Sequence, residues 1–196
     1  MRAKVIARVL AVWTAVIAHN AMAAPVPMDL PVRAAQLLDQ AVIPQQSGRF
    51  APRDECASVA GAREFRLALA QAVLQRDARK VAAMASEDVQ LGFGGDDGRD
   101  RFRNGLDNAG STGFVELERV LALGCAVSED GTLAMPWAFA QDIGDLDVFD
   151  VVQVLGSEVP LYTAAKSKSP ERGRLSWEYV TPVSGFDDKM QFVEVV

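Results

Sequence analysis

The sequence predicts an α+β protein in which a helix-rich part with a small sheet is followed by a short β module. Apolar residues recur at helical spacing over much of the stretch between residues 56 and 124. After Cys125 this period stops, and short apolar segments alternate with turns at intervals of about ten residues, which is typical of small β structures. We therefore expect an α+β domain over residues 56–155 and a β module over residues 156–196.

The clearest helix follows Cys56. Phe65, Leu69 and Val73 recur at four-residue spacing and form one apolar stripe, which predicts a helix from about residue 63 to residue 75. Asp77 is suited to cap the start of a second helix, because its short carboxylate can accept a hydrogen bond from the first turn.

Two more helices and several strands are expected downstream. Phe102 and Leu106 predict a short helix, and the apolar spacing over residues 114–121 predicts another that ends at Gly124. The segment Val89–Phe93 alternates apolar with polar or small residues, as a half-buried strand does. Extended segments are also expected at 133–139, 150–155, 159–161, 175–179 and 190–195.

The first 23 residues have the parts of a secretory signal peptide. Three basic residues precede an apolar run, Val9–Ala18, and Ala21–Ala23 supplies the small residues that a signal peptidase reads. The run is about half the length that spans a bilayer, so we expect no membrane span. The protein is predicted to be periplasmic or secreted, cleaved after about Ala23, with residues 24–55 as a linker or N-terminal arm that holds one amphipathic segment at 32–42.

Composition excludes several classes of function. Cleavage would remove three basic side chains and leave 17 basic against 26 acidic ones, a net charge of −9, which disfavours nucleic acid as a partner. The only histidine, His19, lies in the signal peptide, so the exported chain has no imidazole for a catalytic triad or for most zinc sites. We predict no catalytic residues, no cofactor and no metal.

Cys56 and Cys125 are the two cysteines of the chain, and they would reach a compartment in which disulfides persist. A bridge between them would close a separation of 69 residues and stabilise the fold by about 4 kcal/mol. Two buried free thiols are the alternative. We favour the bridge.

The C-terminal module resembles a known family. Val159–Tyr162, a Ser/Pro-containing loop and Leu175–Trp177 are similar to the opening of bacterial Src-homology-3-like domains, and residues 187–195 match the next strand, with Phe192 where the family often has tryptophan. The family's final Gly-x-x-Gly-Tyr-Val strand is absent, so the resemblance implies a partial barrel. An open strand edge would then favour self-association.

The upstream part resembles the region that precedes such a module in a group of secreted bacterial proteins with no assigned activity. The resembling residues are Phe65, Leu69, Asp77, Ala78, Leu91–Gly95, Phe102, Leu121–Gly124, Pro136 and Trp137. The helix–helix–strand opening is also similar to nuclear-transport-factor-2-like domains. Together these resemblances imply a secreted binding protein or an envelope-associated protein.

Acidic residues offer candidate chemistry. Asp142, Asp145, Asp147 and Asp150 could supply oxygen ligands for calcium, but their spacing lacks the EF-hand pattern, so a solvated acidic loop is favoured. Glycosidic chemistry needs two carboxylates across a substrate.

The pairs Glu87–Asp88 and Glu116–Glu118 do not suit that chemistry. Neighbours on a strand point to opposite faces, and the second pair is expected on a helix surface.

Trp137, Phe139 and Tyr179 are the candidate ligand-binding residues, because exposed aromatic rings can stack on sugars or on apolar peptide side chains. Trp137 and Phe139 would share one face if their segment is extended; core packing is the alternative, favoured for Trp177. The sequence thus predicts a noncatalytic secreted or periplasmic protein that binds cell-wall glycan or peptide, or another envelope protein. The alternative is a small-molecule-binding protein or Asp-dependent enzyme with a nuclear-transport-factor-2-like pocket.

Overall fold

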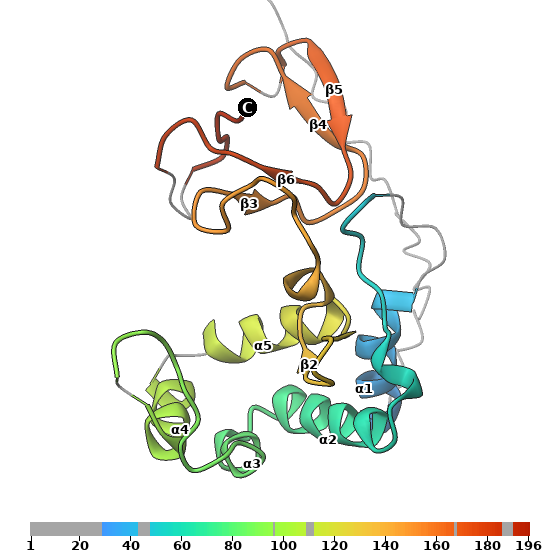
Figure 1. Ribbon diagram of the computed structural model, residues 1–196, viewed down its shortest axis with the longest axis vertical. Helices are drawn as coiled ribbons and strands as arrows, with labels where there is room; N and C mark the ends of the chain where they lie inside the picture. The colour runs from blue at the N-terminus through green and yellow to red at the C-terminus, as the bar shows by residue number, and fades with distance from the viewer. Residues whose placement is uncertain (1–28, 43–47, 96, 109–111, 167, 186–189) are drawn as a thin grey trace, which may run out of the picture.

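A computed structural model describes residues 29–42, 48–95, 97–108, 112–166, 168–185 and 190–196. The expected signal peptide lies outside the described residues. Helices gather at one end of the molecule and the β4–β5 hairpin lies at the other (Figure 1). The α+β class is confirmed, with a helical N-terminal part and a few short strands. The elements are α1 (Leu30–Asp39), α2 (Ala62–Leu74), α3 (Ala78–Ala83), α4 (Arg99–Asn108), α5 (Thr112–Ala122), β1 (Ala126–Val127), β2 (Leu133–Ala134), β3 (Val152–Gln153), β4 (Val159–Tyr162), β5 (Glu171–Leu175) and β6 (Tyr179–Val180).

The main core lies between α1, α2 and α5. α2 and α5 form where the apolar periodicity predicts helices, although Phe65 of the expected stripe in α2 is 46% exposed and the buried face runs through Ala62, Arg66, Ala70 and Val73. Gly124 comes just after α5 with a φ of 84°, as a C-terminal glycine does. α1 lies within the stretch expected as an arm, and it starts with a proline in its first turn. Its apolar face packs on the other two helices. The buried side chains of this core are Ala34, Leu37, Leu38, Ala70, Ala72, Val73, Ala78, Val81, Leu106, Phe114 and Leu121.

α3 starts where Asp77 predicts, since the Lys80 backbone N–H donates to Asp77 Oδ1 at 3.0 Å. The strand expected at Val89–Phe93 is wrong. No other described segment pairs with it, and it folds back on itself instead: Gly98 N–H donates to the Val89 carbonyl at 2.8 Å, and Leu91 N–H donates to Asp97 Oδ1 at 2.8 Å. These bonds close a loop whose described residues are 89–95, 97 and 98, and Phe93 is fully exposed on it.

The described strands make antiparallel pairs of β1 with β2, β3 with β6, and β4 with β5. The stretch expected to be extended at 175–179 is broken at Trp177, whose φ of 54° is left-handed, so β5 and β6 are separate strands. Beyond β6, the chain pairs with its own C-terminal residues. Val183 N–H donates to the Glu194 carbonyl at 2.9 Å, and Val196 N–H donates to the Thr181 carbonyl at 3.0 Å.

Within the described ranges, no helix has both the length and the apolar character needed to cross a bilayer.

Candidate functional site

A disulfide joins Cys56 to Cys125, as the sequence favours, and both cysteines are fully buried. The backbone brings them together. Cys125 N–H donates to the Arg53 carbonyl at 2.9 Å, and Glu55 N–H donates to the Cys125 carbonyl at 2.8 Å. Gly124 allows this approach, because a Cβ there would collide with the Arg53 carbonyl. The segment before α2 is thereby fastened to the end of α5.

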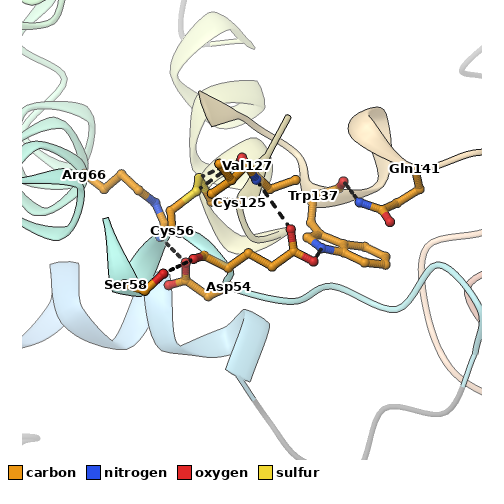
Figure 2. The surroundings of a disulfide bond; sticks show 10 residues. Asp54, Cys56, Ser58, Arg66, Cys125, Val127, Trp137 and Gln141 are labelled. Atoms are coloured by element: carbon orange, nitrogen blue, oxygen red, sulfur yellow. Dashed lines mark hydrogen bonds and ion pairs between the residues drawn. A yellow bond between two sulfur atoms is a disulfide. The ribbon is translucent and has the colours of Figure 1, made fainter. Parts of the chain in front are cut away.

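A buried ion pair lies beside the disulfide (Figure 2). Arg66 on α2 donates from Nη1 to Asp54 Oδ1 at 2.7 Å, and the two side chains are 1% and 3% exposed. Nε and Nη2 of Arg66 have no hydrogen-bond partner among the described residues. The pair joins the segment before α2 to α2, and neither residue lines the two surface hollows described below.

Trp137 is 3% exposed and belongs to the core rather than to a free surface. Its indole N–H donates to Glu55 Oε1 at 2.8 Å, and the Arg53 guanidinium lies over the ring, 4.8 Å from its centroid. Figure 2 shows this indole on the same side of the disulfide as Gln141, whose amide donates to the Trp137 carbonyl at 3.2 Å. Trp137 therefore anchors the chain that follows it.

Tyr179 reaches the same small core. Its ring meets Phe50 edge to face with centroids 4.7 Å apart, and both residues pack with Ala126, Trp137 and Ala138. Partial burial raises the pKa of the Tyr179 phenol. The structure thus brings Trp137 and Tyr179 together as packing residues.

Phe139 is separate from them. The expectation that Trp137 and Phe139 share one face is wrong, because residues Trp137–Ala140 form a 3₁₀ turn instead of a strand. At three residues per turn, side chains two positions apart point in different directions. Phe139 is 75% exposed while Trp137 is buried.

Phe139 begins an exposed segment, residues 139–150, which we name the acidic–apolar loop. Leu146, Val148 and Phe149 are also exposed, the last at 81%. Four aspartates lie between and beside these apolar residues, at positions 142, 145, 147 and 150, and the loop has no basic residue. Half-buried Ile143 packs against the core that contains Trp137, so the loop is anchored at that point.

Two of these aspartates shape the loop. Asp142 Oδ1 accepts from Gly144 N–H at 2.7 Å, and Asp147 Oδ1 accepts from Phe149 N–H at 2.9 Å. Such bonds build tight turns and present Val148 and Phe149 outward. Among the described residues, no group of three or more acidic, histidine or cysteine side chains could hold a metal ion. The loop therefore offers apolar contacts and negative charge.

The carboxylate pairs weighed above lie on the surface. Glu87 is in ion-pair range of Arg99, at 3.9 Å, and Glu116 accepts from Arg119 at 2.9 Å on the same helix. Of these four residues, Glu116 alone lines one of the two hollows described next.

Two surface hollows were not expected from the sequence. An apolar groove of about 370 Å³ lies between α4 and α5, and a polar cleft of about 950 Å³ lies where the α2–α3 turn faces α4. Each is formed where separate elements pack against one another, and the packing of one helix on the next is not given by the apolar spacing within either helix.

Comparison of the chain with models of known protein families, with curated proteins and with solved structures finds no match.

Proposed function

We propose that this chain is a noncatalytic exported binding protein that docks a protein partner of the cell envelope through the acidic–apolar loop. The observation that carries the proposal is the exposure of Phe139, Val148 and Phe149 at 75%, 65% and 81% on one short loop. Large apolar side chains gathered on a surface are typical of interaction sites, and buried aromatic side chains contribute most of the affinity at many interfaces.

The charge of the loop supports a partner with a basic surface. The loop carries four aspartates without a basic residue, in a chain with a net charge of −6. A partner surface that presents lysine or arginine around apolar side chains would complement it, and the attraction would speed association. A neutral glycan could donate hydroxyl hydrogen bonds to these carboxylates but carries no opposite charge, whereas a basic protein surface offers both hydrogen bonds and charge, so we favour a protein over cell-wall sugar.

The anchoring of the loop supports the same function. Trp137 is fixed by Glu55, and the Arg49 guanidinium donates to the Asp142 carbonyl at 2.9 Å. A loop held at these points loses less conformational entropy on binding than a free one, which favours affinity. The Cys56–Cys125 disulfide suits an oxidising compartment, in keeping with export.

A defined peptide tests the proposal. The probe is a fluorescently labelled 14-residue peptide of lysine and leucine, and its charge-reversed control has glutamate in place of lysine. We expect anisotropy titrations to show binding of the first peptide only. The double variant Val148→Ser/Phe149→Ser should weaken binding by about ten-fold or more, the loss expected for an interface hot spot.

The matched control is Phe93→Ser, which removes another fully exposed phenylalanine from a different loop. It should leave the affinity unchanged. Equal weakening by both variants would show nonspecific adhesion and overturn the proposal. Binding of soluble cell-wall glycan fragments that depends on Phe149, with no binding of the cationic peptide, would also overturn it in favour of a glycan ligand.

A further inference from the structure

The polar cleft lies at the helical end of the molecule, where the turn between α2 and α3 faces α4 (Figure 1). It measures about 950 Å³. The side chains and backbone that line it come from Gln75, Arg76, Asp77, Ala78, Arg79, Lys80, Arg103, Asn104 and Asp107.

The cleft is cationic in an acidic protein. Four of its lining residues are basic and two are acidic, whereas the whole chain has a net charge of −6. Lys80 pairs with Asp77 at 3.1 Å and Arg103 with Asp100 at 3.4 Å, both at helix-surface spacing. No carboxylate among the described residues lies within 4.0 Å of the Arg79 guanidinium. The cleft therefore carries a net positive charge, whereas the protein as a whole is negatively charged.

The backbone at Arg76 points to a use for its side chain. Arg76 follows the end of α2 with a φ of 54°, in the left-handed region. Its N–H donates to the Val73 carbonyl at 2.9 Å, and Asp77 N–H donates to the Ala72 carbonyl at 3.0 Å. This is the Schellman arrangement of a helix end, in which the left-handed position is usually glycine. An arginine there gives up some backbone stability; the residue lines the cleft, and its guanidinium lies 6.0 Å from the centroid of the Phe114 ring on α5.

We propose that this cleft binds a phosphate-bearing ligand. Guanidinium groups present several N–H donors in a plane that matches the oxygens of a phosphate, and Arg76, Arg79 and Arg103 surround the cleft from both sides. The ammonium of Lys80 adds a further positive charge. Asp107 opposes an anion and limits the affinity. The phosphate belongs either to a soluble phosphorylated molecule or to a lipid headgroup, and the experiment separates the two.

The test is isothermal titration with tripolyphosphate at low ionic strength, together with cosedimentation on phosphatidylglycerol vesicles. We expect Arg79→Gln/Arg103→Gln to weaken binding by about ten-fold or more, since bonds to charged groups are among the stronger ones. Asp107→Asn should strengthen it. Arg76→Gly should weaken it while the fold is kept, because glycine suits the left-handed backbone; circular dichroism checks the fold.

The control variant Arg172→Gln/Arg174→Gln removes two positive charges from exposed positions of β5, at the other end of the molecule. It should bind like the unchanged protein. Cleft-dependent binding of tripolyphosphate supports a soluble ligand, and cleft-dependent binding of vesicles alone supports a headgroup. Absence of binding to both probes, or equal loss in the cleft and β5 variants, would overturn the proposal.

Discussion

Trp137 and Glu55, 82 residues apart in sequence, are joined by a hydrogen bond of 2.8 Å from the indole N–H to Oε1. The second oxygen of Glu55 accepts from the Val127 backbone N–H at 3.4 Å. One carboxylate thus connects the segment before α2 to the strand after α5 and to the start of the acidic–apolar loop.

Glu55→Ala should lower the free energy of unfolding by about 1–3 kcal/mol, because it leaves the buried indole N–H of Trp137 without an acceptor. Urea denaturation followed by tryptophan fluorescence measures the change. Glu129→Ala, at an exposed position, is the control and should have little effect. Equal stabilities of the two variants would refute the role assigned to Glu55.

Asp54→Asn should be more costly, with a loss of about 3–5 kcal/mol, because it leaves the Arg66 charge buried without its counter-ion. The control is Asp39→Asn, which breaks the exposed ion pair with Arg63 and should change stability by less than about 1 kcal/mol. If chemical denaturation gives the same midpoint for both variants, the buried pair does not hold the N-terminal segment.

A comparison of Gly124→Ala with Gly131→Ala separates two causes of lost stability: the strain of a left-handed alanine and the collision of its Cβ with a neighbour. The two glycines have nearly the same φ, 84° and 83°. A Cβ added at position 124 would collide with the Arg53 backbone, whereas a Cβ added at position 131 would have no atom within 4 Å. Only the strain of a left-handed alanine, about 1–2 kcal/mol, is expected at 131. At 124 we expect a larger loss in thermal denaturation; equal melting temperatures would contradict the close approach that positions the cysteines.

The contribution of Asp77 to stability should depend on pH, and the structure gives the direction of that dependence. Hydrogen bonds from the Lys80 backbone and then from its side chain lower the pKa of the Asp77 carboxyl in the folded protein. The ionised Asp77 carboxylate therefore stabilises the fold fully at pH values above the pKa of an aspartate in the unfolded chain, which is about 4. This contribution is lost as the pH falls through the lower pKa of Asp77 in the folded protein. The melting temperatures of Asp77→Asn and the unchanged protein should converge on acidification; a constant difference down to pH 2 would contradict this.

Local patterns predicted the helices well. The four-residue spacing of Phe65, Leu69 and Val73 and the capping carboxylate of Asp77 act within a single turn or two, so they can be read without knowing the rest of the fold. The alternation at Val89–Phe93 predicted a strand that is not there. A strand forms only when another strand pairs with it, and no described segment pairs with these residues.

The sites depend on contacts across the chain. No sequence signal shows that Trp137 is buried by Glu55 and Arg53, or that Arg76 and Arg103 face the same cleft. The sequence predicts Phe139 as a candidate from its aromatic ring and from its alternation with Trp137, whereas its exposure follows from a 3₁₀ turn that alternation does not reveal. The Src-homology-3-like character of residues 156–196 stays a prediction.

Site-specific photocrosslinking in producing cells tests the central claim most directly. A photoreactive phenylalanine analogue replaces Phe149, or Phe93 as the control, in the full chain. We predict a protein adduct from position 149 alone, with lysine or arginine near the crosslinked site of the partner, and a strong reduction when Asp145 and Asp147 are changed to asparagine. The same adducts from both positions, or an adduct at 149 that is indifferent to those aspartates, would contradict docking through the acidic–apolar loop.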